Sequence, residues 1–216
     1  MIAAVFAGSV RPLPPEGHPS GIVKEAMAGP VLLGPLGLEG DAQADRRVHG
    51  GPDKALHHYP AEHYAVLAAA WPDSAARFVP GSIGENVSTT GWTEETVCVG
   101  DVFRIGAARV QVTQPRSPCW KINHRYGLGD ALQFVAERGI TGWYCRVIEA
   151  GRIAAGDAFE LVERHAEPVT LRRLWQITRS HRPAAEELSR LAQTPGLSES
   201  WAEKLRGRLE WLRANG

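Results

Sequence analysis

The densest group of reactive side chains in this 216-residue chain lies between Gly37 and Tyr64. Four of the eight histidines fall within fifteen residues of this segment: His49, His57, His58 and His63. Two adjacent glycines, Gly50 and Gly51, follow the first histidine. Because glycine has no Cβ, a turn at this point lets backbone amides approach a ligand closely, and amides arranged in that way bind anions. The segment therefore predicts an anion-binding loop.

Two other interpretations of the histidine-rich segment remain open. Zinc binding is one, but the chain has no His-Glu-x-x-His motif, and His57, His58 and His63 do not form the i, i+4 pair that is typical of such sites. The other is that these polar residues only form turns and helix caps.

A second cluster, Thr113–Lys121, contains the cysteine best placed for chemistry. Its two prolines fix the backbone and prevent a helix, so we expect a stiff loop. Cys119 lies between Arg116 and Lys121, and nearby positive charge favours a thiolate, the form that binds metals or attacks electrophiles. The alternative is that Cys119 is a small buried hydrophobic residue, which is common for free cysteines.

A third cluster, Gly84-Glu85-Asn86, interrupts an apolar run. A glutamate and an asparagine in such a run must be hydrogen-bonded or face a polar cavity. From the residues alone, the three clusters indicate a β-rich enzyme with one activated cysteine in an anion-binding pocket, and they leave its chemistry undetermined.

The elements that must position these clusters are mostly short strands. Seven runs have strand length and β-branched or aromatic content: Ile2–Phe6, Gly21–Met27, Ile83–Ser88, Val102–Ile105, Arg109–Thr113, Trp143–Ile148 and Ala158–Val162. Two helices are predicted among them, Ala61–Trp71 and Asp130–Arg138. Many strands with few helices favour an all-β barrel or sandwich over a parallel α/β sheet.

At about residue 166 the sequence pattern changes from short strand-like runs to helical segments. Three amphipathic segments predict helices at Thr170–Thr178, Ala184–Gln193 and Trp201–Arg213. We therefore predict a β domain over residues 1–165 and a small three-helix domain over residues 166–216. The arginines on these helices favour a solvated surface, with phosphate or partner binding as the alternative.

Composition excludes several classes of protein. The 24 basic and 24 acidic side chains balance, which argues against a dedicated nucleic-acid binder. No apolar run approaches the roughly 20 residues that cross a bilayer, so no membrane role is expected. Three scattered cysteines, Cys98, Cys119 and Cys145, argue against a disulfide framework and favour a cytoplasmic location.

Six segments, in this order, resemble MOSC domains, the modules shared by molybdenum cofactor sulfurases and amidoxime-reducing enzymes: Leu36–Asp41, Val48–Leu56, His58–Pro60, Gly84–Asn86, Val99–Asp101 and Gln114–Cys119. The chain is most similar to the stand-alone bacterial type linked to resistance against 6-hydroxylaminopurine. The resemblance implies a mainly β fold, a MOSC-type β-barrel with a few helices, followed by a small C-terminal three-helix domain.

The resemblance also implies a molybdenum cofactor, a pterin dithiolene, with Cys119 as the thiolate ligand of the metal. Soft thiolate donors suit such a centre. The residues expected to anchor the cofactor by the same match are His49, Lys54, Asn86, Arg116, Ser117 and Lys121. Asp53 and His58 are the expected proton-handling groups.

The implied reaction is reductive removal of oxygen from a small N-hydroxylated substrate, a base or an amidoxime, which leaves the amine. Three dispersed cysteines cannot form a Cys₄ iron–sulfur site, so an external electron-transfer protein is expected as partner. A neutral surface with seven tryptophans permits a homodimer without requiring one.

Two alternative functions stay open. One is a carrier of the molybdenum cofactor or of sulfur that has no turnover; no segment resembles a pyridoxal-binding desulfurase, so the chain is not expected to mobilise sulfur by itself. The other is a cysteine enzyme without any cofactor.

Overall fold

The computed structural model describes residues 1–215 and contains thirteen strands and seven α-helices in that range. The strands are β1 Ile2–Ala7, β2 Arg11–Leu13, β3 His18–Ser20, β4 Glu25–Ala26, β5 Val31–Gly34, β6 Gly37–Leu38, β7 Leu56–Pro60, β8 Val87–Thr89, β9 Val102–Ile105, β10 Ala108–Pro115, β11 Trp143–Glu149, β12 Gly151–Ile153 and β13 Phe159–Glu163. The helices are α1 Arg46–His49, α2 Glu62–Ala70, α3 Lys121–Tyr126, α4 Ala131–Arg138, α5 Leu171–Arg179, α6 Ala185–Ala192 and α7 Glu199–Asn215, with 3₁₀ turns at Pro52–Lys54 and Pro72–Arg77.

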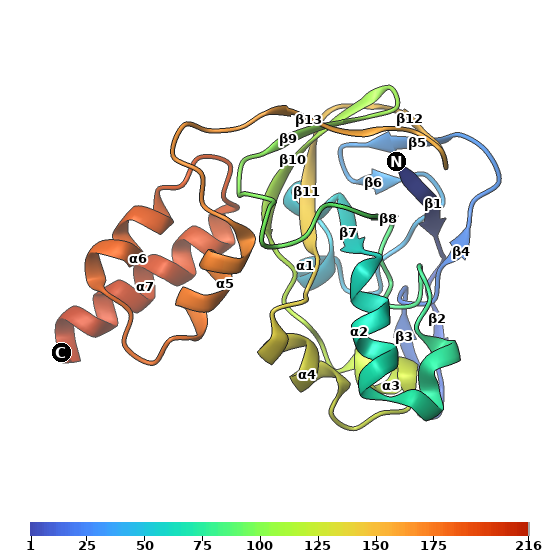
Figure 1. The fold of residues 1–216 in the computed structure, drawn as a ribbon, viewed down its shortest axis with the longest axis horizontal. Helices are drawn as coiled ribbons and strands as arrows, with labels where there is room; N and C mark the ends of the chain where they lie inside the picture. The colour runs from blue at the N-terminus through green and yellow to red at the C-terminus, as the bar shows by residue number, and fades with distance from the viewer. Residues whose placement is uncertain (216) are drawn as a thin grey trace.

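Eight strands form the main sheet, in the order β13-β9-β10-β11-β7-β8-β1-β4. All neighbours in it are antiparallel except β7 and β8, which are parallel. A three-stranded sheet, β12-β5-β6, and the β2–β3 hairpin complete the β structure (Figure 1). Helices α2, α3 and α4 lie together at one end of the sheet.

The predicted closed barrel is wrong: within residues 1–215 the main sheet has two edges, β13 and β4. The sheet curls enough to bring β1 close to the turn before β13. There the Ile2 amide donates to the Asp157 carbonyl (2.8 Å) and the Gly156 amide donates to the Ile2 carbonyl (2.9 Å). At Gly156, with φ of 90°, the backbone turns, so the contact with β1 consists of these two hydrogen bonds and does not continue as strand pairing. The chain is a mixed fold of open sheet and helices.

Alternation along β10 explains how the sheet builds the core. Val110 and Val112 are both fully buried in the main hydrophobic cluster, while Gln111 on the opposite face is half-buried. Thr113 shares the face of Gln111 yet is buried, because the 3₁₀ turn at Pro52–Lys54 covers it. The Thr113 hydroxyl lies 2.7 Å from the Asp53 carbonyl and 3.0 Å from the Tyr144 carbonyl.

Two Gly-Asp corners start strands in the same way. Gly100 and Gly156 both have a positive φ, 83° and 90°. In each corner the following aspartate accepts a hydrogen bond from the amide three residues before it, Cys98 for Asp101 (2.8 Å) and Ala154 for Asp157 (2.7 Å). The similar stretches Gly100–Phe103 and Gly156–Phe159 thus share one turn geometry.

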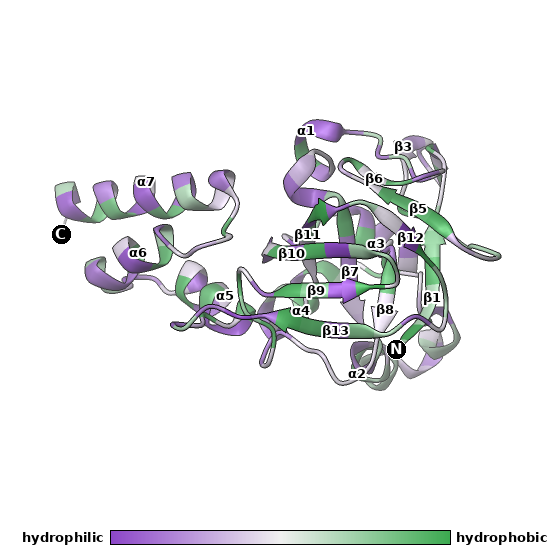
Figure 2. Ribbon diagram, turned by 90° about the horizontal axis from the view of Figure 1, so that it is seen from above, coloured by the Kyte–Doolittle hydropathy of each residue, from purple (hydrophilic) through white to green (hydrophobic). Residues whose placement is uncertain are grey.

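The three C-terminal helices, α5, α6 and α7, pack as a group beside the sheet (Figure 1). Hydrophobic and hydrophilic residues alternate along α7, whereas β1 and β5 are mostly hydrophobic (Figure 2). The helices share one hydrophobic cluster with the sheet. The Trp175 indole donates to the Ala136 carbonyl (2.8 Å), and the Leu171 amide donates to the Val97 carbonyl (2.9 Å). All five helices expected from the sequence are present, and no end is shifted by more than two residues.

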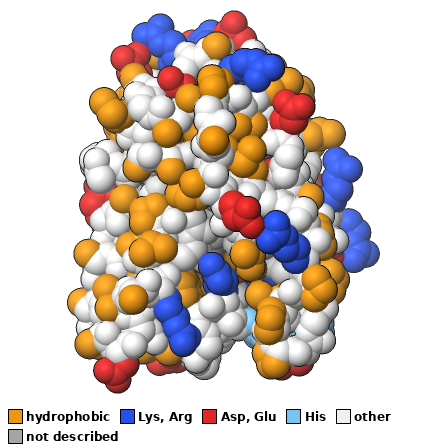
Figure 3. Space-filling model, turned by 90° about the vertical axis from the view of Figure 1, so that its right-hand side faces the viewer, with side chains coloured by type: hydrophobic (Ala, Val, Ile, Leu, Met, Phe, Trp, Pro, Cys, Tyr) orange, Lys and Arg blue, Asp and Glu red, His pale blue; other side chains and the backbone are white. Residues whose placement is uncertain are grey.

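The face at the right of Figure 1 carries Lys and Arg side chains interspersed with hydrophobic and acidic ones, without a continuous basic surface (Figure 3). None of the helices described in residues 1–215 combines the length and apolar character needed to cross a membrane.

Candidate functional site

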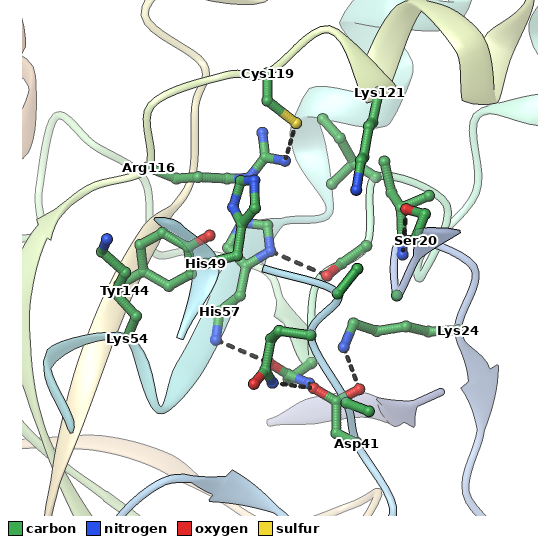
Figure 4. A pocket seen from close by; sticks show the side chains of 18 residues that line it. Ser20, Lys24, Asp41, His49, Lys54, His57, Arg116, Cys119, Lys121 and Tyr144 are labelled. Carbon is green, nitrogen blue, oxygen red and sulfur yellow. Dashed lines mark hydrogen bonds and ion pairs between the residues drawn. The ribbon is translucent and has the colours of Figure 1, made fainter. Parts of the chain in front are cut away.

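A pocket opens between the loops around β7, β10 and β3, in a hollow of about 550 Å³ that is open to solvent (Figure 4). Its lining residues come from five separate parts of the chain: Ser20, Gly21, Ile22, Lys24, Asp41, Ala42, Gln43, Ala44, His49, Lys54, His57, Ile83, Gly84, Asn86, Arg116, Cys119, Lys121 and Tyr144.

Arg116 is the most unusual residue of the pocket, because its guanidinium is buried without a carboxylate partner among the described residues. The residue is 4% exposed. Nη2 lies 3.8 Å from Cys119 Sγ and the Tyr144 side chain interacts with the guanidinium, while Nε and Nη1 have no hydrogen-bond partner. A guanidinium cannot lose its proton in a protein, and leaving it unpaired in the interior is costly. The geometry therefore favours an anion at this place.

The backbone on both sides of Arg116 is fixed. Its amide donates to the Gly142 carbonyl at the end of β10 (3.0 Å). Beyond it, the stiff loop predicted from the two prolines carries half-buried Cys119 into the pocket. Helix α3, which the sequence analysis did not predict, begins directly after this loop, and the Ile122 amide donates to the Cys119 carbonyl (3.0 Å). The backbone of Cys119 is thus fixed by the first turn of α3.

Positive charges converge on His49. Burial, and then the charges of Arg116, Lys121 and Lys54, lower the pKa of His49 to about 4. The imidazole is therefore neutral at pH 7 and can accept as well as donate a hydrogen bond. Lys54 Nζ donates to the Val48 carbonyl (2.6 Å), so it is fixed at the wall of the pocket.

His57 and His58 point to opposite faces of β7, as neighbours in a strand must. His57 lines the pocket, and its Nδ1 lies 3.2 Å from the Gly84 carbonyl. Since a carbonyl only accepts, Nδ1 carries the proton and Nε2 presents a free lone pair, which has no partner. Burial, and then Arg116, lowers the pKa of His57 well below its ordinary value.

His58 lies in the core, away from the pocket. Its ring stacks on Trp143 with centroids 4.0 Å apart, and its Nε2 lies 2.8 Å from Thr89 Oγ1. Burial lowers the pKa of His58 to about 3, so it is neutral. Neighbouring residues of β7 point to opposite faces, so His57 lines the pocket and His58 does not. The position of His58 therefore gives no geometric support for the predicted proton-handling role.

Asp53 and Ser117 also lie outside the pocket lining. Asp53 Oδ1 pairs with Arg146 Nε (2.9 Å), which directs the carboxylate toward β11. Ser117 is exposed on the loop before Cys119. The structure therefore brings together six of the expected residues: Cys119, His49, Lys54, Asn86, Arg116 and Lys121.

Asn86 lines the pocket, but its side-chain amide is hydrogen-bonded to other groups of the protein. Its Oδ1 accepts from the His57 amide (3.0 Å), and its Nδ2 donates to the Phe6 carbonyl (3.2 Å) and to Asp41 Oδ2 (3.0 Å). Asp41 in turn forms a buried ion pair with Lys24. Asn86 thus fixes β7 and the Lys24–Asp41 pair in position.

Polar residues of the lining that were not among the predicted site residues include Lys24, Asp41, His57 and Tyr144. Two signals point to two of them: the strand alternation that separates His57 from His58, and the Gly-Asp ending of the segment Leu36–Asp41. Tyr144 belongs to the polar-aromatic run Gly142–Tyr144, which is as typical of a core strand as of a site. Burial raises the pKa of Tyr144, so its hydroxyl stays protonated.

The arrangement is suited to an anionic ligand that also takes a thiolate. The buried guanidinium, Lys54 and Lys121 provide positive charge, His57 and His49 provide neutral ring nitrogens, and Cys119 provides sulfur. Within residues 1–215, no three side chains of His, Cys, Asp and Glu form a group that could hold a metal ion by themselves. The zinc interpretation therefore finds no ligand set in that range.

Fold and pocket together define a MOSC-type module. The MOSC domain model matches residues 45–160, which is more than half of the chain. The chain belongs to the MOSC family.

The full length of the chain has close relatives. It is 43% identical to the protein YiiM of Escherichia coli over 94% of this chain and 90% of that protein. The crystal structure of YiiM from Geobacillus stearothermophilus superimposes with a TM-score of 0.82 at 33% identity, covering 97% of this chain and 98% of that chain. A protein of Gibberella moniliformis named "Reductase" is 33% identical over 82% of this chain, which is 31% of that longer protein. The chain is thus homologous to YiiM, a stand-alone MOSC protein.

Proposed function

We propose that this protein binds a molybdenum cofactor and reduces small N-hydroxylated compounds, bases or amidoximes, to amines. The observation that carries the proposal is Arg116: a guanidinium, 4% exposed and without a carboxylate partner in the described chain, whose Nη2 lies 3.8 Å from Cys119 Sγ. MOSC domains are associated with this cofactor, and a longer relative is named a reductase, which supports an oxidoreductase-type function.

The residues of the pocket fit such a group. Its phosphate is an anion that Arg116 and Lys54 can bind, since a guanidinium meets phosphate with two parallel hydrogen bonds. Cys119 offers the soft sulfur donor that suits the metal. When bound, the cofactor supplies the two-electron redox centre of the reaction.

The chain itself orients ligands and holds protons. His57 presents Nε2 as an acceptor because Nδ1–H is used on Gly84. Tyr144 Oη keeps its proton, and Lys121 Nζ is held by the Pro19 carbonyl (2.8 Å) at the rim. These three residues line the pocket, whereas Asp53 and His58 do not, and they are the side chains that we propose to contact the polar atoms of a substrate.

The test is molybdenum content per chain after expression in a host that makes the cofactor, for wild type, Cys119→Ser and the matched control Cys98→Ser. Cys98 is buried away from the pocket. We expect near-stoichiometric metal in wild type and Cys98→Ser and loss of metal in Cys119→Ser. Metal retained with unchanged spectra in Cys119→Ser would contradict the ligand assignment.

Turnover is tested separately, with a chemical electron donor and an N-hydroxylated purine. Amine formation that depends on Cys119 supports the reductase. Stoichiometric metal without amine formation favours the carrier, and activity without any molybdenum favours the cysteine enzyme.

A further inference from the structure

One buried carboxyl group has no role in the site described above. Glu85 is fully buried, although its two chain neighbours, Gly84 and Asn86, both line the pocket. Because Glu85 is not part of the lining itself, its side chain lies behind this wall of the pocket. A carboxyl group in such a position must be hydrogen-bonded, paired with a cation or protonated.

The hydrogen bonds of Glu85 leave one of its oxygens unpaired. Oε1 accepts from the Tyr64 hydroxyl and from the Gly81 amide, both at 2.6 Å. Oε2 is buried and has no hydrogen-bond partner in the part of the chain that the structure describes. The nearby cation Lys24 is already paired with Asp41. This arrangement favours the protonated acid over the carboxylate.

The other groups packed around Glu85 are neutral. Burial raises the pKa of three tyrosines, so their hydroxyls stay protonated: Tyr59, Tyr64 and Tyr126. Tyr126 Oη lies 2.9 Å from Ser82 Oγ, whereas Tyr59 Oη is buried without a partner in residues 1–215. Both Tyr59 and Tyr126 lie within the electrostatic influence of Glu85 on one side and of Arg116 on the other. The buried cluster thus extends from Glu85 to the guanidinium of the pocket.

Glu85 titrates in the range in which a ligand can change its charge. Burial raises its pKa to about 7, and the hydrogen bonds to the carboxylate and then the charge of Lys24 lower it only in part. The group is therefore about half protonated at pH 7. An anion in the pocket adds negative charge and offsets that of Lys24, which lines the pocket. Both effects favour the neutral acid and raise the pKa of Glu85 further.

We propose that Glu85 takes up a proton when an anion binds in the pocket, so that ligand and proton enter the interior together. Glu85 acts from behind the wall and does not touch the ligand. The use of this proton rests on the proposed function: reduction of an N-hydroxyl group to an amine and water consumes two protons, together with two electrons from the external donor. A proton stored on Glu85 would be one of the two.

The test is the binding of sulfate, a dianion that does not titrate near neutral pH, to the cofactor-free protein. Isothermal titration calorimetry at pH 7 in two buffers of different ionisation enthalpy gives the number of protons taken up. We expect up to about half a proton per bound sulfate in wild type, and loss of most of this uptake in Glu85→Gln. Arg116→Met should lose sulfate binding, because the anion loses its buried partner.

Glu94→Gln is the matched control. Glu94 is equally buried, but both of its oxygens are hydrogen-bonded, to His63 Nε2 (2.6 Å) and to the Gly142 amide (2.7 Å). Its variant should take up as many protons as wild type. Equal uptake by wild type and Glu85→Gln would overturn the proposal, and so would the absence of sulfate binding. Uptake that is lost in His49→Gln but kept in Glu85→Gln would overturn it in favour of the imidazole.

Infrared difference spectra provide a second measurement, made on wild type itself. At pH 7, sulfate should increase the C=O stretching band of a protonated carboxyl group, and this increase should be absent in Glu85→Gln. No increase in wild type would overturn the proposal. Neither measurement involves molybdenum or turnover, so the coupling can hold where the proposed function fails, and the reverse.

Discussion

Replacing Arg116 by methionine should stabilise the protein when no ligand is bound. The guanidinium is buried, its Nε and Nη1 have no hydrogen-bond partner, and its neighbours are neutral or weakly acidic: Cys119 Sγ at 3.8 Å and the Tyr144 side chain. Methionine keeps an unbranched stem and fills the space with apolar atoms. Because buried charged groups can be replaced by hydrophobic ones with a gain of about 1–4 kcal/mol, we expect the free energy of unfolding of the cofactor-free protein to rise by that amount. For a chain of this size the gain corresponds to a rise in Tm of about 2–4 °C per kcal/mol.

With the ligand bound, wild type should be more stable than Arg116→Met. A ligand at one hundred times its Kd stabilises the folded state by about 2.7 kcal/mol, and Arg116→Met should lose most of this gain because the anion loses its buried partner. The assay is urea unfolding and calorimetry of both proteins, cofactor-free and loaded. Arg146→Met is the matched control: Arg146 pairs with half-buried Asp53, so its loss should destabilise both forms slightly. A cofactor-free Arg116→Met less stable than wild type would refute the anion-site argument.

Three further outcomes follow from individual residues. Burial raises the pKa of Glu85 from 4.5 to about 7, so the stability that protonated Glu85 contributes is fully present below pH 4.5 and is lost as pH rises through 7. In urea unfolding, the stability of Glu85→Gln relative to wild type should therefore increase by about 3 kcal/mol across that range. A difference that does not change with pH would contradict this. Gly142→Ala places a Cβ 2.4 Å from the His58 carbonyl at a φ of 67°; calorimetry should show a loss of about 1–3 kcal/mol, and an unchanged Tm would show that the backbone can adjust. Asp41→Ala leaves Lys24 buried and unpaired; we expect a loss of about 3–5 kcal/mol in urea unfolding, whereas a loss below 1 kcal/mol would mean that water reaches the lysine.

Strand and helix positions could be predicted where the local pattern is strong. Val102–Ile105 is a strand with the predicted ends, and Gly139, with φ of 63°, ends α4 as a C-cap. The predicted strand Ile83–Ser88 is a strand only from Val87, because Gly84 turns with φ of 89° against Ile22. That contact joins residues about sixty positions apart, and no local pattern records it.

The site was predictable in its centre and not at its edges. Cys119 and Arg116 share one short loop, so their types and spacing were informative. Tyr144 and Lys24 reach the pocket only through the pairing of β10 with β11 and of β1 with β4. Whether such a sheet closes into a barrel depends on how far its strands curl, and no local amino-acid pattern encodes that curvature; here the sheet stays open.

The shared hydrophobic cluster of sheet and helices has a consequence for how the molecule melts. Residues of β10, α5 and α7 belong to one contiguous core, and the Gly196 and Gly100 backbones lie so close that a Cβ on Gly196 would be 2.5 Å from the Gly100 Cα. Near residue 166 the chain therefore changes from strands to helices, and both parts share one hydrophobic core. Heat should unfold it as a single cooperative unit, with one calorimetric peak whose van't Hoff enthalpy equals the measured one.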